Sequence, residues 1–284
     1  MSAEHGGVKL RKARELCPFR RWRVAAGPTL CGMAALSVLR ELWDRVWGMQ
    51  PAPPGWEVAA CAGVALLVIA NRPAWHVARN AITIAHEGGH AVVSLLSGRK
   101  LDGIRLHADT SGVTYSRGRR NGLGIVLTAA AGYIAPSLLG LAAAWLLAAH
   151  HVTAMLWLLL ALLVATFLAI RNAYGVLALL GTAGAVFAVS YLASAAVQGA
   201  FGYATAWFLL LGGIRPVAEM QQGRRQAMRR RQPLTSDADQ LARLTRMPAG
   251  LWVGVFWVVS LAALAVGARL LLPVSLVHLA HLPR

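Results

Sequence analysis

Long apolar runs separated by short polar segments make up most of the chain after residue 54. Runs of this length can cross the hydrocarbon core of a bilayer as helices. Seven such spans are predicted, over residues 55–70, 81–97, 123–149, 152–170, 173–193, 200–214 and 251–272. The pattern therefore predicts an all-α polytopic membrane protein with about seven transmembrane helices.

Two shorter patterns lie outside these spans. Residues 104–108 and 113–117 alternate apolar and polar positions around a turn at 109–112, which predicts a short β-hairpin. Residues 24–39 form a short apolar run that leads into charged residues, which favours an interfacial helix over a span. The domains expected are a basic segment over 1–54, a single transmembrane domain over 55–272 and a short tail over 273–284.

The composition agrees with a membrane protein, since 57% of the residues are hydrophobic and 14% are charged. The net charge is +17, but 21 of the 28 lysines and arginines fall in three polar blocks, at 9–23, 99–120 and 215–246. Seven spans with a cytoplasmic N-terminus place all three blocks inside, as the positive-inside rule requires. We therefore expect contact with a lipid bilayer and no nucleic-acid partner.

The second predicted span contains His86-Glu87-Gly88-Gly89-His90, an H-E-x-x-H motif. Two histidines four residues apart leave the same face of a helix, so both imidazoles can bind one Zn²⁺ ion. Glu87 can take a proton from a water molecule beside that ion. A carboxylate at mid-bilayer costs roughly 2.5–3.5 kcal/mol on insertion scales, which favours a functional role. The two glycines are expected to allow close approach of another helix or of a substrate backbone.

A catalytic zinc normally has a third protein ligand, and the patterns of soluble zinc peptidases do not supply it here. Leu96 occupies the position where a metzincin has its third histidine, and no glutamate follows at the distance typical of thermolysin-like enzymes. The remaining acidic and imidazole candidates after His90 are Asp102, Asp109, Glu219, Asp237, Asp239, His107, His150, His151, His278 and His281.

An H-E-x-x-H in an early membrane helix, a basic hairpin after it and a late aspartate resemble the site-2 protease family of intramembrane zinc metalloproteases. The residues similar to its compact bacterial, peptidase M50B-like branch are His86 to His90, Ser111-Gly112, Arg171-Asn172 and Ser236-Asp237-Ala238. The resemblance covers about residues 55–272. It implies a zinc endopeptidase of a bacterial plasma membrane that cuts a membrane-protein substrate in regulated intramembrane proteolysis, towards the cytoplasmic side.

In the wider family the third ligand is the aspartate of an Asp-Gly motif on a later membrane helix. Asp102-Gly103 matches those letters but comes only twelve residues after His90, so Asp237 is the better match, although no glycine follows it. Helical spacing supports Asp237 as well, because it shares a face with Leu241 and Leu244.

Asp239 is the competing late aspartate. It shares the opposite face with Arg243 and Arg246 and is expected to pair there and to stay in water. It also lies three residues after Ser236, a spacing that resembles a capping box. The choice between Asp237 and Asp239 as the ligand stays open at this point.

The resemblance also suggests where a substrate binds. In site-2 proteases the β-segment after the motif helix is thought to hold the substrate as an extended strand, and an exposed strand edge can satisfy its backbone groups. Ile104 and Leu106 in the hairpin, and Asn172 near the start of a later span, are the expected substrate contacts. An ordinary cytoplasmic hairpin is the alternative.

We expect an intramembrane zinc metalloprotease in which His86, His90 and Asp237 bind the metal and Glu87 is the catalytic base. One alternative is a catalytically inactive relative that binds membrane proteins, against which the intact Glu87 argues. The other is a transporter or channel that uses intramembrane His and Glu, but the chain lacks the paired broken helices typical of such proteins. The sequence sets neither the substrate nor the oligomeric state.

Overall fold

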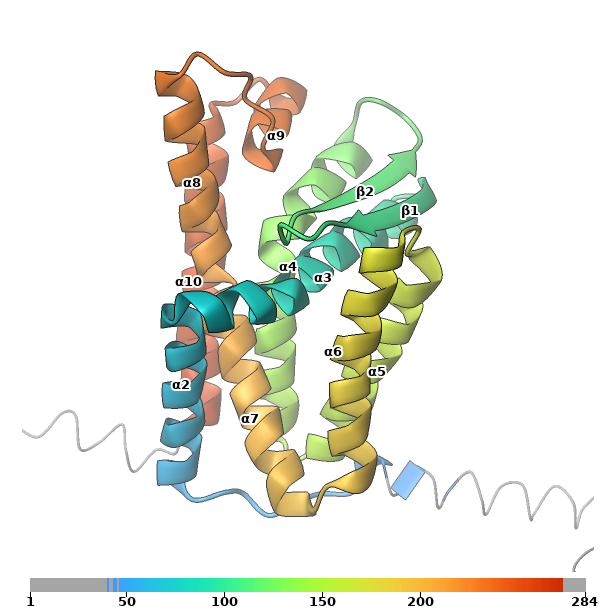
Figure 1. Cartoon of the computed structure of the whole chain (residues 1–284), viewed down its shortest axis with the longest axis vertical. Coiled ribbons are helices and arrows are strands. Elements are labelled where there is room, and N and C mark those ends of the chain that lie inside the picture. Colours follow the sequence, from blue (N-terminus) through green and yellow to red (C-terminus); the bar gives the residue numbers. More distant parts are fainter. Residues whose placement is uncertain (1–39, 41–42, 45, 273–284) are drawn as a thin grey trace, which may run out of the picture. The chain divides into compact units, whose positions relative to one another are not determined.

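Helices that are apolar on every side account for most of the structure, as expected of segments that contact both lipid and one another. The computed structural model describes residues 40, 43–44 and 46–272. In that part of the chain the helices are α2 (Gly55–Ala70), α3 (Arg72–Leu96), α4 (Leu123–Ala148), α5 (Val152–Ala169), α6 (Ala173–Leu192), α7 (Ala195–Gly212), α8 (Ile214–Arg229), α9 (Asp237–Thr245) and α10 (Ala249–Leu271) (Figure 1). The expected interfacial helix at 24–39 and the tail at 273–284 lie outside the described residues.

Five helices of the described part are long and apolar enough to cross a membrane: α4, α5, α6, α10, and α7 continued by α8. Helices α2 and α3 pass the same test only as a pair, and they bend by 103° at the break between them. The described chain therefore has five candidate spans, or six if the bent pair counts as one. The expected count of seven is not confirmed, because the first two predicted spans form this bent pair.

The bend has a local cause at Asn71. Pro73 follows in the first turn of α3, where its missing N–H costs nothing, whereas a helix continuing from α2 would lose a hydrogen bond there. The Asn71 side chain accepts a hydrogen bond from the Ala74 amide at 3.0 Å and so caps the new helix. The chain therefore ends α2 and starts α3 in a new direction.

Polar side chains hold this bend against α8. Glu219 receives hydrogen bonds from the Trp75 indole at 3.2 Å and from Arg215 at 2.9 Å, and it lies 3.4 Å from Arg79. Arg215 also donates to the carbonyl oxygen of Ile69 and lies over the Trp75 ring. The start of the basic block at 215–246 thus stabilises the helix bundle, in addition to any role at a membrane surface.

The bent pair carries the chain once from one end of the unit to the other. Before α2, the Gln50 amide donates to the carbonyl oxygen of His150, and its side chain donates to Thr153, both at the α4–α5 turn. The hairpin lies at the opposite end, where Ile104 pairs in parallel with Ile170 between α5 and α6 (Figure 1). The seven-span prediction would have returned the chain to the end where it started.

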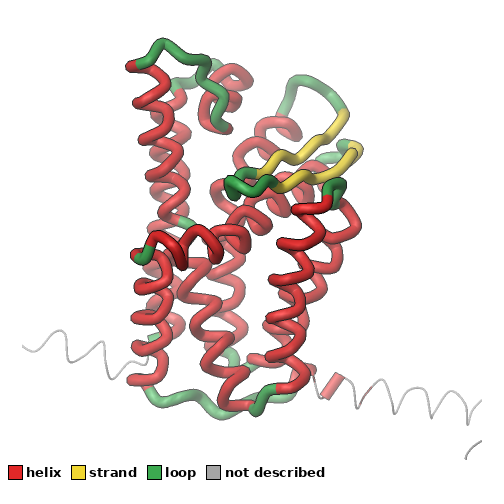
Figure 2. Tube along the Cα trace, in the orientation of Figure 1, coloured by secondary structure: helices red, strands yellow, loops and turns green. Residues whose placement is uncertain are grey.

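The expected hairpin is confirmed as the antiparallel strands β1 (Lys100–Leu106) and β2 (Gly112–Arg117), with Leu106 opposite Gly112 (Figure 2). On β2, Gly112, Thr114 and Ser116 are half-buried, while Val113 and the other intervening residues are exposed. Strands alternate sides, so the small and hydroxyl-bearing face of β2 is the inner one.

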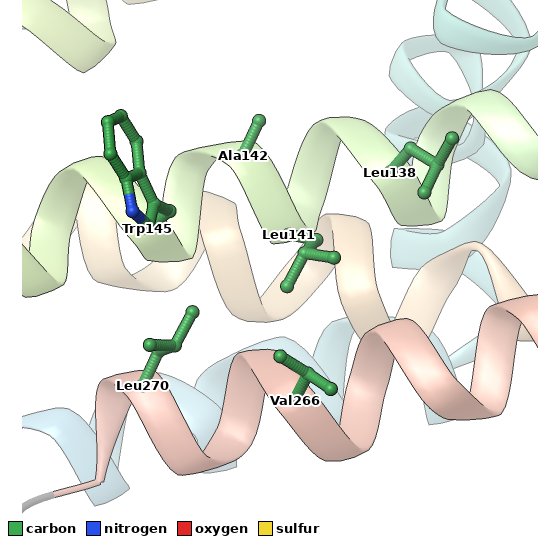
Figure 3. Close-up of a pocket in the computed structure, with 6 residues that line it drawn as sticks. All are labelled: Leu138, Leu141, Ala142, Trp145, Val266 and Leu270. Carbon is green, nitrogen blue, oxygen red and sulfur yellow. The ribbon is translucent and has the colours of Figure 1, made fainter.

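An apolar groove of about 450 Å³ lies between α4 and α10 (Figure 3). Its lining residues are Leu138, Leu141, Ala142, Trp145, Val266 and Leu270. All six present carbon surface, apart from the indole nitrogen of Trp145, and none belongs to the H-E-x-x-H motif. The groove therefore has the chemistry of a lipid-facing surface.

Candidate metal centre

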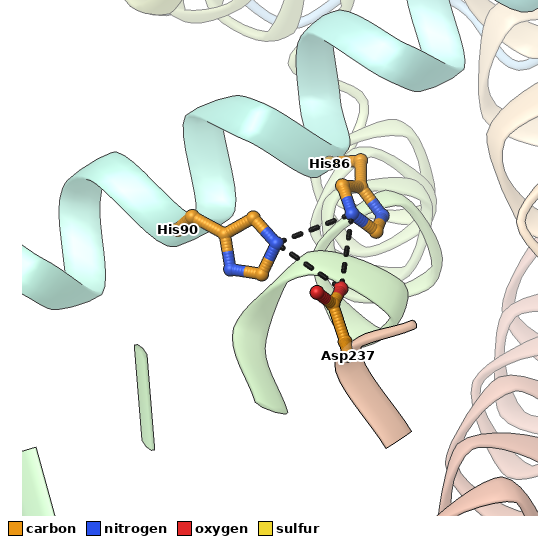
Figure 4. A group of neighbouring side chains, drawn as sticks. All are labelled: His86, His90 and Asp237. Carbon is orange, nitrogen blue, oxygen red and sulfur yellow. Dashed lines mark hydrogen bonds and ion pairs between the residues drawn. The ribbon is translucent and has the colours of Figure 1, made fainter. Parts of the chain in front are cut away.

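The two motif histidines lie one helical turn apart on α3 and face Asp237, the first residue of α9 (Figure 4). Their Nε2 atoms are 3.2 Å apart. Asp237 Oδ2 lies 3.3 Å from Nε2 of His86 and 3.2 Å from Nε2 of His90. Among the described residues, these three make up the group of His, Cys, Asp or Glu side chains that could hold a metal ion.

The spacing of the three atoms fits a zinc ion. Metal–ligand bonds of roughly 2.0–2.1 Å place the corners of a tetrahedron about 3.3–3.4 Å apart. The three edges here, 3.2, 3.2 and 3.3 Å, are close to that value. Asp237 Oδ2 is also buried without a conventional hydrogen bond, as expected of an atom that faces a metal site. Two imidazoles and one carboxylate are a donor set that zinc accepts, and they leave a fourth position open.

The ring of His90 is oriented by a backbone contact. Its Nδ1 lies 2.6 Å from the carbonyl oxygen of Thr128 on α4. A carbonyl oxygen only accepts, so Nδ1 carries a proton, and in the neutral imidazole Nε2 then keeps its lone pair for a metal. The ring of His86 packs edge-on against Tyr133, which in turn stacks on Phe256. Both rings therefore have a fixed orientation.

Helix α4 reaches the two imidazoles at a glycine. A Cβ atom at Gly132 would lie 2.4 Å from Nε2 of His90 and 2.6 Å from Nε2 of His86. A Cβ at Gly89 of α3 would lie 2.4 Å from the Cβ of Ala135, which is about one turn after Gly132 on α4. No side chain fits at either position, so glycine is what allows α3 and α4 to approach this closely. The use expected for the motif glycines, close approach of another helix, is seen at Gly89.

The third side chain of the group is held in place by the start of α9. Ser236 caps this helix, and the carboxylate of Asp239 accepts from the Ser236 amide, which completes the expected capping box. Asp239 also accepts from Arg224 of α8 at 2.8–2.9 Å. Asp237 follows Ser236 directly, so the same contacts fix its backbone beside α3.

The expectation that Asp239 stays in water is wrong. Its side chain is only 5% exposed, and its ion-pair partner is Arg224 in place of Arg243 and Arg246. Helical spacing showed which residues share a face of α9, but it did not show that Arg224 of α8 reaches the face of Asp239. Arg243 instead donates to the carbonyl oxygen of Leu234.

Both late aspartates are held in the ionised form. Burial raises the pKa of Asp237, but the imidazoles of His86 and His90 outweigh the burial and leave that pKa below its usual range. Burial likewise raises the pKa of Asp239, and the contacts with Arg224 and Ser236 lower it further than burial raises it.

Glu87 lies beneath the hairpin and is only 3% exposed. Thr114 of β2 donates a hydrogen bond to Oε2 of Glu87 at 2.6 Å, and its hydroxyl is 3.1 Å from the Glu87 carbonyl oxygen. The turn of the hairpin is held against α3, because Thr83 donates to the carbonyl oxygen of Thr110. Strand β2 is therefore fixed over the motif.

A model of the Peptidase M50B-like family matches residues 59–267, which is more than half of the chain and includes His86, His90 and Asp237. The chain belongs to the Peptidase M50B-like family. The resemblance to site-2 proteases inferred from the motif is confirmed at this level, and membership supports a membrane metalloprotease. Comparisons with curated proteins and with solved structures found no match.

The three expected substrate contacts of this M50B-like protein have structural roles. The side chains of Ile104 and Leu106 are buried in an apolar cluster. Asn172 exchanges two hydrogen bonds with the backbone of Leu106, and the Arg171 amide donates to the Ile104 carbonyl oxygen. Residues 170–172 therefore cover the outer edge of β1, and this geometry does not support substrate binding there.

The hairpin aspartates lie outside the metal group. Asp102 pairs with Arg117 across the two strands at 2.6–2.8 Å. Asp109 accepts hydrogen bonds from Ser111 within the turn, and these bonds lower the pKa of its carboxyl. Both therefore have partners that explain their presence.

Sequence reasoning did not assign Gly132, Thr114 or Arg224 to the site. Gly132 lies in a segment that helix packing alone would explain, and Arg224 belongs to a basic run that the membrane surface would explain. For Thr114 a signal existed, because it lies on the same face of β2 as Gly112. Gly112, Thr114 and Ser116 alternate with Val113 and the other outward residues of β2. A strand face made of such small and hydroxyl-bearing residues is unusual where the strand packs on an apolar helix.

Proposed function

We propose that this M50B-like protein is an intramembrane zinc metalloprotease that hydrolyses a peptide bond in or near a transmembrane segment of another protein. The supporting observation is the triangle of His86 Nε2, His90 Nε2 and Asp237 Oδ2, whose edges match a tetrahedral zinc site. Family membership supports a membrane metalloprotease. Zinc bound to this triangle would act as a Lewis acid towards both the scissile carbonyl and a water molecule.

Glu87 is the proposed general base. Its Oε2 accepts from Thr114, which leaves Oε1 to take the proton of the attacking water. The water oxygen bonds to the carbonyl carbon, the C–N bond breaks, and the proton passes from Oε1 to the leaving nitrogen. His90, whose Nδ1 proton is bound to the carbonyl oxygen of Thr128, and His86 act as ligands and take no part in this proton transfer.

The substrate is proposed to enter as an extended strand along β2. Within the described residues β2 pairs only with β1, while the outer edge of β1 is covered by residues 170–172. Peptide hydrolysis needs the substrate helix unwound, and the outer edge of β2 can receive the backbone groups that unwinding frees. The inner face of β2 touches Glu87. A substrate strand docked on the outer edge of β2 would therefore bring its peptide bonds near this base.

We place the hairpin and the α8–α9 end in the cytoplasm of a bacterial cell. The basic block 99–120 and the part of block 215–246 from residue 224 onwards lie at this end of the unit (Figure 1). Such a concentration of positive charge is typical of cytoplasmic segments in the plasma membrane. Cleavage would therefore occur towards the cytoplasmic side of the substrate.

The proposal is tested by comparing membranes from cells that express the wild-type protein or Glu87→Gln. New protein N-termini are mapped by mass spectrometry, so no substrate has to be known in advance. We expect cleavage within or beside transmembrane segments with the wild type only, and about one zinc per chain in both purified proteins. His86→Ala should lose the zinc as well as the cleavage.

Identical sets of N-termini in the wild-type and Glu87→Gln membranes would contradict the proposal and favour the inactive relative. Loss of zinc from Glu87→Gln as complete as that from His86→Ala would show that Glu87 is a ligand. A protein that moves ions but produces no new N-termini would favour the transporter.

A further inference from the structure

The contact between β2 and Glu87 is closer than packing of a hairpin on a helix requires. A Cβ atom at Gly112 would lie 2.6 Å from Cγ, 2.7 Å from Oε1 and 2.8 Å from the carboxyl carbon of Glu87. Two residues further along the same face, Thr114 Oγ1 lies 2.6 Å from Oε2. Strand β2 therefore both leaves space for the carboxylate and binds one of its oxygens.

The hydrogen bond from Thr114 fixes an otherwise flexible side chain. Glutamate has three rotatable side-chain bonds, so a fixed donor is needed to hold its carboxylate in one orientation. Threonine is branched at Cβ and has few χ1 rotamers, so its hydroxyl is a well-placed donor. A bond of 2.6 Å between a hydroxyl and a carboxylate is in the strong, charge-assisted range.

We propose that Thr114 is a positioning residue for Glu87, and that Gly112 is the opening in β2 that makes this contact possible. The inference rests on the proposed function, in which Glu87 is the base. Thr114 holds Oε2, and the space at Gly112 takes Oε1, so the carboxylate is kept in one orientation for the proton transfer. The strand that is proposed to receive the substrate on its outer edge thus orients the base with its inner face.

The test compares Thr114→Val, which keeps the shape of the side chain but removes the hydroxyl, with Thr114→Ser, which keeps the hydroxyl. Ser116→Ala is the matched control, because Ser116 lies on the same face of β2 but contacts Arg99 in place of Glu87. Fluorescein-labelled β-casein, an unfolded protein able to bind as a strand, serves as the probe with the zinc-loaded, detergent-purified full chain.

We expect Thr114→Val to lower kcat about 10- to 100-fold at an unchanged KM, because a misplaced catalytic group costs up to about that factor. Thr114→Ser should stay within a few-fold of the wild type, Ser116→Ala should match it, and all variants should keep about one zinc per chain. A merely structural role would change KM, zinc content or stability without rescue by serine.

A second measurement needs neither zinc nor activity. Thermal unfolding of the metal-free full chain is followed for Thr114→Val, Glu87→Ala and the double variant. If the two side chains bind each other, the Tm losses of the two single variants, added together, should exceed the Tm loss of the double variant by about 2–4 °C. Additive losses would overturn the contact on which the inference rests.

The two proposals fail in different ways. If the wild type cleaves casein and Thr114→Val cleaves it equally well, or if Thr114→Ser is as impaired as Thr114→Val, the positioning role is wrong and the protease is retained. If the wild type produces no cleavage of casein and no new N-termini in membranes, both proposals fall, even where the unfolding data show the contact.

Discussion

His86 and His90 reach the candidate metal centre from α3, a helix of 25 residues that packs along α4, whereas Asp237 reaches it from α9, a helix of 9 residues. On the histidine side, glycines let two helices touch, and the contacts are steric apart from the hydrogen bond between His90 and Thr128. On the aspartate side, a cap and an ion pair hold a short segment, and the contacts are polar. The first side is built by close packing and the second by charge.

This difference predicts how each half responds to substitution. A side chain added on the histidine side has no space and must displace a ligand. A polar partner removed on the aspartate side leaves the ligand in place but with more freedom. Substitutions on the histidine side should therefore abolish zinc binding, whereas substitutions on the aspartate side should weaken it by amounts that differ from one contact to the next.

The largest effect is expected for Gly132→Ala. The added methyl group would lie 2.4–2.6 Å from Nε2 of both histidines, so it should exclude zinc and abolish proteolysis. Metal content and chelator competition should show zinc affinity lowered by more than about 100-fold, beyond the range typical of lost outer contacts. Gly181→Ala, at a glycine of α6 with open space around it, is the control. Tight zinc binding by Gly132→Ala would refute the steric account.

An intermediate effect is expected for Arg224→Ala. The buried carboxylate of Asp239 would lose its ion-pair partner, and breaking such a pair costs about 3–5 kcal/mol. Much of this loss falls on α9, so zinc affinity measured by competition should drop about 10- to 100-fold while some binding remains. Arg225→Ala removes an exposed neighbour and should bind zinc like the wild type. Equal affinities for the two variants would show that the pair does not hold Asp237.

The smallest effect is expected for Ser236→Ala. Loss of the cap costs about 1 kcal/mol, which corresponds to roughly a fivefold change in an equilibrium constant. Zinc affinity should fall by no more than this factor, and the metal-free protein should unfold a few degrees earlier. Thr235→Ala, at the preceding exposed residue, should change neither quantity. A loss as large as that of Gly132→Ala would mean that the two halves do not differ as described.

Features that depend on short sequence separations were predictable. The spacing of His86 and His90 predicted their shared face, the alternation around 109–112 predicted the hairpin, and Ser236 with Asp239 predicted the cap. Each of these patterns is decided within about fifteen residues, where helix and strand geometry alone set the positions.

Features that depend on distant partners were not predictable in this way. The burial of Asp239 depends on Arg224 in another helix, and the role of Asn172 depends on Leu106. The bend between α2 and α3 did have a local signal, Asn71 followed closely by Pro73, but two separate spans fit the apolar pattern equally well. The periodicity of a sequence shows which residues share a face of a helix or strand, but it does not show which other element of the protein contacts that face.

The length of β2 limits how much of a substrate can dock. Six residues form this strand. As a helix, six residues extend about 9 Å, whereas as a strand they extend about 20 Å. Unwinding a substrate along the whole of β2 would therefore lengthen that segment by about 11 Å, and the flanking chain would have to shift by the same distance. A span that ends close to a flexible segment can shift in this way, whereas one that runs directly into a folded domain is held back.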